Sequence, residues 1–377
     1  MVSNDRPNLA AQQAGDPGLN KSRPPAQGRV VALTGAFGFL GRRLIRRLER
    51  DPTVQRIVAI DIRDPMELAR REGESTEPAT FLKNHGRISA HNLDLTLAGS
   101  ATVLSDILRA EEVDTVCHLA FLSNPSHAEE LAHELETIGT MYVLNAAKAA
   151  GVKRLSSLST TMLYGARSDN PAWLRETDPL RSRSANLWLR DKADAEEQVR
   201  RFAEATPECA VSILRMGLVL GGGSRNFWSR YFHRSRVPTV LGFDPLVQVL
   251  HAEDAAEGLY ATVMQGPRGL YHLVGRGVLP LSNVIRGLGK RSLPLPASAG
   301  SALLSSLWQA QLIEIPPSFL DYVRWSWVAD GAQLREAVGF VPSLNTAEAV
   351  RRTRADQTLA ATAYDFRGSN SPPRTAS

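Results

Sequence analysis

The chain has 377 residues, of which 43% are hydrophobic and 22% charged, and it carries a formal net charge of +5. These proportions are those of a globular protein with a sizeable core, and they exclude a disordered or fibrous chain. The positive charge is small and scattered, so the sequence predicts no nucleic-acid surface.

Several other classes of protein are also excluded. The two cysteines, Cys117 and Cys209, are too few for a disulfide framework and lie in apolar segments, which predicts buried, reduced thiols in a cytoplasmic protein. The histidines lack the spacing of a metal site, so no metal is expected. No apolar stretch reaches the roughly 18 residues that a membrane span needs, and the N-terminus lacks the apolar segment of a signal peptide.

In chain order, the polar residues Met1–Gly28 are expected to be disordered. From Arg29 onward, β-branched segments alternate with helical ones, which is typical of a parallel sheet with crossover helices. The expected strands are Arg29–Thr34, Arg56–Asp61, a short one near Ile88, Thr115–Ala120, Arg154–Ser159, Val211–Met216 and Gly269–Val274. The expected helices are Leu40–Arg50, Leu97–Ala110, Glu129–Ala150 and Leu187–Glu204. The order predicts an α/β fold with a doubly wound parallel sheet of the Rossmann type.

The remaining segments have weaker periodicity and hold many of the prolines and tryptophans. We interpret residues 29–275 as the Rossmann domain, with insertions at about 167–184 and 222–247 that belong to a second lobe. Residues 276–350 complete this smaller, discontinuous lobe, which we expect to bind the substrate. Residues 351–377 form a C-terminal extension whose end is expected to be disordered.

A glycine-rich turn, Gly35-Ala36-Phe37-Gly38-Phe39-Leu40-Gly41, joins the first strand to the first helix. Glycine permits a tight turn and a close approach of backbone N–H groups to a diphosphate, and the helix N-terminus adds partial positive charge. The turn alone is a weak signal, but Asp61 ends the next strand, twenty residues after Gly41. Its carboxylate can accept hydrogen bonds from the adenosine ribose and repels a 2′-phosphate, which favours NAD over NADP. Arg42 and Arg63 are nearby guanidiniums that could reverse this preference.

Further segments accompany this turn, namely His118-Leu119-Ala120, the run from Val152 to Tyr164-Gly165, and Leu214-Arg215-Met216. With them the chain resembles the extended short-chain dehydrogenase/reductases, and within these the NAD-dependent epimerase/dehydratase family typified by UDP-glucose 4-epimerase. The resemblance covers almost all of the chain between Val30 and Val350. It implies an NAD-dependent oxidoreductase acting on a small molecule, and a homodimer.

The resemblance also implies roles for single residues. Those around the cofactor are Gly35, Gly38, Phe39, Leu40 and Gly41 at the diphosphate, Asp61 and Ile62 at the ribose, Asp94 and Leu95 at the adenine, and Leu119 and Ala120 along its length. The catalytic hydroxyl of the family falls on Thr160, four residues before Tyr164.

One position departs from the family in a way that affects the chemistry. The family uses a Tyr-x-x-x-Lys pair on one helical face, and its lysine matches Lys192, which can still bind the nicotinamide ribose. The position four residues earlier is Trp188. An indole has no group that titrates usefully, so Trp188 cannot be the general base. A second departure is Glu136, where relatives have an asparagine before their Gly-Thr pair.

These departures leave three interpretations. The protein is an atypical enzyme whose proton path uses Tyr164, Thr160 or Glu136; or the helix alignment is shifted, although the chain has no other Tyr-x-x-x-Lys; or catalysis is lost and the protein is an NAD-binding sensor or scaffold. We favour the atypical enzyme, with Thr160, Lys192 and Tyr164 as catalytic candidates. A packing role for Tyr164 and a solvated surface position for Glu136 are the plain alternatives.

The expected substrate wall is the segment from Gly221 to Trp228. Arg225 and Asn226 could bind a diphosphate, and Trp188 could stack on a base or sugar. The resemblance makes a nucleoside-diphosphate sugar the leading substrate class. A sterol-like hydroxyl is the alternative, favoured by the apolar segment Ala302–Ile313.

Overall fold

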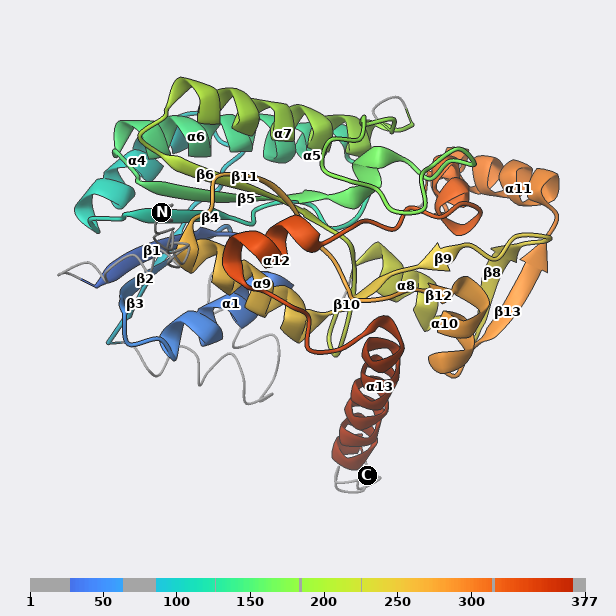
Figure 1. Cartoon of the computed structure of the whole chain (residues 1–377). Helices are drawn as coiled ribbons and strands as arrows, with labels where there is room; N and C mark the ends of the chain where they lie inside the picture. Colours follow the sequence, from blue (N-terminus) through green and yellow to red (C-terminus); the bar gives the residue numbers. More distant parts are fainter. Residues whose placement is uncertain are drawn as a thin grey trace, which may run out of the picture.

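A seven-stranded parallel sheet, in the order β11-β6-β5-β4-β1-β2-β3, forms the centre of the protein (Figure 1). The structure is a computed structural model that describes residues 28–63, 86–125, 127–182, 185–224, 226–313 and 316–368. The strands of the sheet are β1 (Arg29–Thr34), β2 (Val54–Asp61), β3 (Ile88–Asn92), β4 (Thr115–His118), β5 (Arg154–Thr160), β6 (Ala210–Met216) and β11 (Gly269–Leu273). The chain moves outward through β2 and β3 and then returns to the other side of β1 with β4. The predicted doubly wound sheet is therefore confirmed, with its reversal of strand order between β1 and β4.

Helices cover both faces of this sheet (Figure 1). On one side lie α4 (Ser100–Ala110), α6 (Gly139–Ala149) and α7 (Leu187–Ala205), and on the other α1 (Phe39–Glu49), α9 (Ala252–Gln265) and α12 (Ala332–Val338). Strand β1 shows why its sequence is almost continuously apolar: Val30 and Ala32 pack into the first layer and Val31 and Leu33 into the second. Helix α12 belongs to this core through Leu334 and Val338, so part of the segment predicted as lobe packs with the Rossmann domain.

The helix expected at Glu129–Ala150 is interrupted. It consists of α5 (Glu129–His133), a π-helical turn η1 (Glu134–Ile138) and then α6. Such turns widen a helix by one residue and are frequent at functional sites. The turn contains Glu136, whose side chain is fully buried, so the solvated position considered for Glu136 is wrong.

The second lobe is built from short elements. Its strands pair as β7 (Leu218–Leu220) with β10 (Val249–His251), β8 (Arg236–Val240) with β13 (Arg291–Leu295), and β9 (Leu246–Val247) with β12 (Leu279–Pro280). Its helices are α8 (Phe227–His233), α10 (Leu281–Gly287), α11 (Ala297–Gln309) and α13 (Thr346–Gly368), and two 3₁₀ turns, η2 (Thr161–Tyr164) and η3 (Pro317–Val323), lie beside them. The aromatic rings of α8 are buried here, with Trp228 stacked on Trp327 at 5.6 Å between ring centroids. These aromatics therefore form the core of the lobe.

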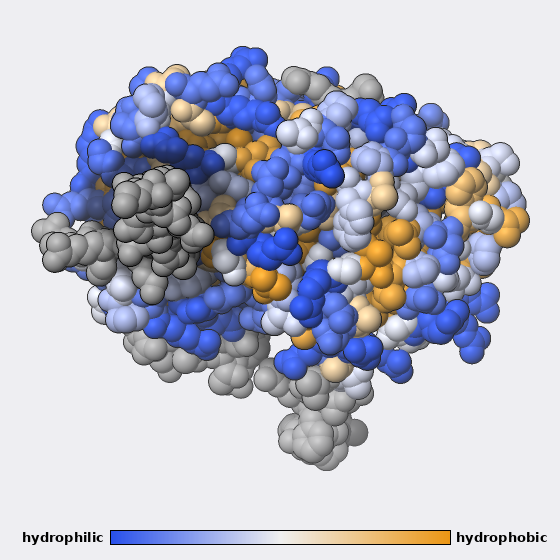
Figure 2. All heavy atoms as spheres, viewed as in Figure 1, coloured by the Kyte–Doolittle hydropathy of each residue, from blue (hydrophilic) through white to orange (hydrophobic). Residues whose placement is uncertain are grey.

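Helix α11 and the C-terminal extension were both singled out from the sequence. Helix α11 includes part of the apolar segment Ala302–Ile313, and Figure 2 shows apolar residues at the surface around it. None of the helices in the described part of the chain has the length and apolar character required to cross a membrane. The C-terminal extension begins as helix α13, whereas the predicted disordered tails lie, apart from Gly28 and Gly368, outside the described residues.

Candidate functional site

The turn between β1 and α1 has the geometry of a phosphate-binding site. Gly35 has a left-handed backbone (φ 67°), and a Cβ atom on Gly41 would lie 2.4 Å from the carbonyl oxygen of Ala36. Helix α1 begins after Gly38, and this N-cap residue has no side chain with which to cap the first turn. Backbone N–H groups at an uncapped helix N-terminus bind anions, because their partial positive charge has no other partner. The residues present therefore fit the diphosphate of a dinucleotide.

Asp61 lies beside this turn at the end of β2, as predicted. Its carboxylate is 3% exposed and accepts a hydrogen bond from the backbone N–H of Phe37, 2.9 Å away. The guanidinium of Arg63 binds the same carboxylate, with Nε 2.9 Å from Oδ1. The carboxylate thus braces the turn and also holds a cation next to the position expected for the ribose.

The other predicted cofactor residues surround the same turn. A Cβ atom on Gly35 would lie 2.7 Å from the carbonyl oxygen of Leu119 and 2.8 Å from the nitrogen of Ala120, so the turn packs directly against the segment after β4. Ile62 is 59% exposed, and Leu95 is buried. Asp94 is engaged locally, because its Oδ1 accepts hydrogen bonds from the backbone and hydroxyl of Thr96.

Lys192, on helix α7, lies next to Phe121, which follows Leu119 and Ala120 in the segment after β4. Its Nζ is 2.9 Å from Oε1 of Glu136, and the two side chains are 11% and 0% exposed. Oε1 of Glu136 also accepts the backbone N–H of Leu122, 2.8 Å away, whereas Oε2 has no hydrogen-bond partner among the described residues. The ammonium lies 4.8 Å from the centre of a Trp188 ring and 5.3 Å from that of Phe121. The lysine is therefore enclosed by one carboxylate and two aromatic rings.

Burial controls the charge states in this cluster. It raises the pKa of Glu136. The positive charge of Lys192 opposes this effect, whereas the negative charge of Asp191 strengthens it. It also lowers the pKa of His118 to about 3, with a further contribution from Lys192, so the imidazole is neutral. His118 bridges the hydroxyls of Thr34 and Thr140, and Thr140 donates to the carbonyl oxygen of Glu136. These bonds tie the π-helical turn to β1 and β4.

Trp188 is mostly buried and does not present a free polar group. Its indole N–H donates to the carbonyl oxygen of Leu122, 3.2 Å away, and its ring lies 5.9 Å from that of Phe319. Trp188 therefore closes the cluster on the side of the second lobe, one helical turn before Lys192.

Tyr164 is not brought together with Lys192. Its side chain is fully buried, and its hydroxyl lies 2.6 Å from Nε2 of His272 and also contacts the guanidinium of Arg215. Burial raises its pKa to about 12. Thr160 is partly exposed at the end of β5, where its hydroxyl accepts the backbone N–H of Met162.

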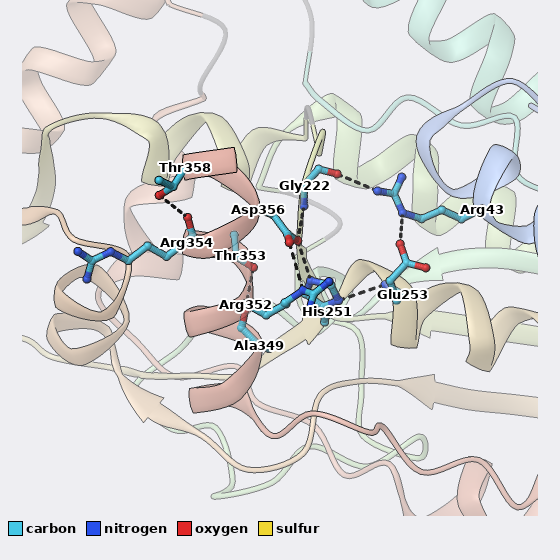
Figure 3. A network of polar contacts seen from close by, with 10 residues as sticks. All are labelled: Arg43, Gly222, His251, Glu253, Ala349, Arg352, Thr353, Arg354, Asp356 and Thr358. Atoms are coloured by element: carbon cyan, nitrogen blue, oxygen red, sulfur yellow. Dashed lines mark hydrogen bonds and ion pairs between the residues drawn. The ribbon is translucent and has the colours of Figure 1, made fainter. Parts of the chain in front are cut away.

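The predicted substrate wall is held by structure around it. Asn226 caps helix α8 by accepting the N–H of Ser229 and donates to the carbonyl oxygen of Val219, and Arg225 lies outside the described residues. Figure 3 shows Gly222 between two elements: Arg43 of α1 donates to its carbonyl oxygen at 2.8 Å, and Asp356 of α13 accepts its N–H at 3.2 Å. Helices α1 and α13 thus hold this loop from opposite sides.

A cavity of about 260 Å³ lies elsewhere, beyond β11 and next to α12. Its lining includes Trp173, Arg276 and Arg335, and also His272, the hydrogen-bond partner of Tyr164. Glu136, Trp188 and Lys192 do not line it. Among the described residues, no cluster of His, Cys, Asp and Glu could hold a metal ion.

Sequence reasoning missed three parts of the site. It did not pair Glu136 with Lys192, it assigned no role to Phe121 and Leu122, and it did not recognise Asp356 as a partner of the loop at Gly222. The replacement of an asparagine by Glu136 was the available signal for the first. The others depend on contacts between distant segments that leave no local pattern.

Comparison with known proteins places this geometry in a family. Residues 31–272 match the NAD dependent epimerase/dehydratase family. An uncharacterized protein of Mycobacterium tuberculosis is 30% identical over 332 residues, which are 87% of this chain and 84% of that protein.

Solved structures share the fold. A dTDP-glucose 4,6-dehydratase of Bacillus anthracis in complex with NAD has a TM-score of 0.66 at 12% identity, over 88% of this chain and 97% of its own. A UDP-glucose 4-epimerase of Thermotoga maritima with UDP-glucose has a TM-score of 0.65 at 14% identity, over 88% and 99%. Because the family match covers more than half of the sequence and agrees with the fold, the chain belongs to the NAD dependent epimerase/dehydratase family.

Proposed function

We propose that this protein is an oxidoreductase of the epimerase/dehydratase type that oxidises a secondary hydroxyl of a nucleoside-diphosphate sugar with NAD. One observation carries the proposal. The short segment after β4 contacts the phosphate-binding turn at Leu119 and Ala120 and the Lys192–Glu136 pair at Phe121 and Leu122. A dinucleotide held at the turn and extended along this segment would bring its nicotinamide end to Lys192.

NAD, the predicted cofactor, is the one after which the family is named. When bound, it supplies the acceptor for hydride from the substrate carbon. The first turn of α1 would hold its diphosphate, Asp61 its adenosine ribose, and Lys192 its nicotinamide ribose. Arg63 lies against Asp61 and reduces the number of carboxylate lone pairs left for the ribose hydroxyls.

The substrate class is supported by the loop from Gly221 and by the fold. The loop lies beyond the carboxyl ends of the strands, where ligands of open α/β sheets bind. The dehydratase and the epimerase that share the fold are named for dTDP-glucose and UDP-glucose. A sterol-like hydroxyl is the second enzymatic candidate, and the partly exposed apolar residues Leu304 and Trp308 of α11 favour it.

A non-catalytic NAD-binding protein is the alternative from a different class. The observation that favours it is Trp188, which replaces the expected phenol and whose only polar group is bonded to Leu122. In this case Lys192 would hold the cofactor without proton transfer.

Two measurements separate these functions. Calorimetry should detect NAD binding by the wild type and by Gly86→Ala, whose new Cβ meets no atom within 4 Å, whereas Gly41→Ala should weaken binding at least about tenfold because its Cβ meets the Ala36 carbonyl. Absence of binding by folded wild-type protein would contradict both functions.

The second measurement is turnover of a panel of UDP- and dTDP-sugars and sterols, followed by absorbance of the reduced nicotinamide and by product analysis. Turnover that Lys192→Ala abolishes would exclude the non-catalytic function. Silence across the whole panel, with NAD bound, would favour it.

We further propose a cytoplasmic homodimer. The buried free thiols of Cys117 and Cys209 support a reducing compartment, and light scattering of the purified protein would test the dimer.

A further inference from the structure

We infer that Lys192 and Glu136 form the proton-transfer pair of this protein, with Lys192 exchanging the proton with the substrate hydroxyl and Glu136 receiving it from Lys192. The inference rests on the proposed function and deepens it. It assigns to a carboxylate and an amine the role for which the family uses a tyrosine.

The first support is that a contribution to the stability of the fold does not explain a buried carboxylate at Glu136. A carboxylate with no exposed surface is retained in native proteins when hydrogen bonds satisfy it. Here Oε1 has two donors, but Oε2 has none among the described residues. An unsatisfied buried oxygen in a π-helical turn marks a group kept for something other than folding.

The second support is that the side chain of Lys192 is partly accessible to solvent, whereas that of its partner Glu136 is not. Its side chain is 11% exposed, whereas that of Glu136 is inaccessible. One of its three N–H bonds points to Glu136, and its remaining surroundings include the faces of Trp188 and Phe121, which offer no strong acceptor. The ammonium can therefore donate its proton to one carboxylate and then accept another from a hydroxyl.

The proton balance is complete. The Lys192 ammonium transfers a proton to the Glu136 carboxylate and becomes a neutral amine. Bound NAD would supply the acceptor for the hydride of the substrate C–H bond, while the amine would take the hydroxyl proton, so that the substrate would become a ketone. The pair then holds one proton more than at rest, and this proton returns when the ketone is reduced or leaves to solvent.

The other hydroxyls lack such a connection. The hydroxyl of Tyr164 is bound by His272 and Arg215, in a cluster distinct from Lys192. Thr160 can still bind the substrate oxygen. Its aliphatic hydroxyl stays protonated at neutral pH, so it cannot act as the base that takes the substrate proton.

The charged and titratable groups around Glu136 set the pH dependence. They are Lys192 and Asp191 from α7, His118 from β4, and His133, which pairs with Asp191, from α5. Burial raises the pKa of Glu136, so the folded state holds its proton more tightly than the unfolded state does. The contribution of Glu136 to stability is present below its unfolded pKa of about 4.3 and is lost as the pH rises through the folded value.

The first test needs no substrate. The melting temperature of Glu136→Gln minus that of the wild type should increase as the pH is raised from about 4 to 8. Glu176→Gln is the matched control, because burial also raises the pKa of Glu176, away from Lys192. It should show the same trend. A flat difference for Glu136→Gln would mean that Glu136 does not titrate in the folded protein, and the inference would fail.

The second test uses the substrate found with the panel. Glu136→Gln should lower kcat at least about 100-fold, the usual contribution of general acid–base catalysis, while NAD still binds. Glu136→Asp should recover part of the rate, and Glu136→Gln with Trp188→Tyr should recover more by restoring the phenol four residues before Lys192. Glu176→Gln should leave kcat unchanged.

The outcomes distinguish the two proposals. Full kcat in Glu136→Gln defeats the proton-transfer pair and leaves the proposed function intact. Folded protein that binds no NAD defeats the proposed function itself. NAD binding without turnover of any sugar or sterol defeats the pair together with the proposed chemistry and leaves the binding function.

Discussion

Helix α7 contributes one residue to each of two buried ion pairs, Lys192 and, one turn later, Glu196. The two pairs differ in how many of their carboxylate oxygens have hydrogen-bond partners. Glu196 pairs with Arg215, each with 1% of its side chain exposed, and its two oxygens also accept from Ser159 and Arg200. Glu136 pairs with Lys192 but keeps one oxygen without a partner among the described residues.

The pKa directions follow this difference. Hydrogen bonds from Arg215 and Ser159, together with the charge of Arg215, overcome burial and lower the pKa of Glu196. At Glu136 burial wins, and the pKa is raised. The comparison teaches that complete hydrogen bonding lowers the pKa of a buried carboxylate, whereas burial with an unsatisfied oxygen raises it.

Breaking the complete pair should have the largest effect. Arg215→Met leaves the Glu196 carboxylate without its main partner in the core, and we expect a loss of about 3–5 kcal/mol in the free energy of unfolding. Urea unfolding measures it. Arg200→Met is the control, because Arg200 is 42% exposed and contributes at most about 1 kcal/mol. Equal losses in both variants would contradict the structural role of the Arg215–Glu196 pair.

The pH dependence of stability should separate the two glutamates by sign. Because the pKa of Glu196 is lowered, its stabilising contribution is present above the unfolded pKa of about 4.3 and is lost as the pH falls through the folded value. The stability difference between wild type and Glu196→Gln should therefore shrink below about pH 4, by about 1.4 kcal/mol for each unit of pKa shift. Glu136→Gln should show the opposite trend, gaining on the wild type as the pH rises. The same sign in both variants would remove the distinction.

Removing the hydroxyl of Tyr164, which contacts Arg215 of the Arg215–Glu196 pair, should have the smallest effect. Tyr164→Phe deletes one hydrogen-bond partner of Arg215 and His272, so we expect about 1–2 kcal/mol less stability. NAD affinity and kcat should not change, because Tyr164 does not reach the Lys192 cluster. A large fall in kcat with a normal melting temperature would return Tyr164 to the list of catalytic candidates.

Much of the fold could be predicted because the signals are local, whereas the cofactor-binding roles of single residues stay predictions. The strand, glycine turn and helix from Arg29 to Glu49 are contiguous, and helix α7 extends from Leu187 to Ala205, close to its expected bounds. The π-helical turn at Glu134–Ile138 could not be predicted, because a single inserted residue leaves the helical periodicity on both sides unchanged.

By itself the sequence determined the order of elements, the glycine-rich turn between β1 and α1 and the absence of a tyrosine four residues before Lys192. Each follows from residues close together in the chain, where backbone conformation depends on neighbours. Only the tertiary structure decided which side chains meet: Glu136 with Lys192, 56 positions apart, Tyr164 with His272, 108 positions apart, and Asp356 with Gly222. Such pairings, and the pKa shifts they cause, depend on how helices and strands pack, which no local pattern records.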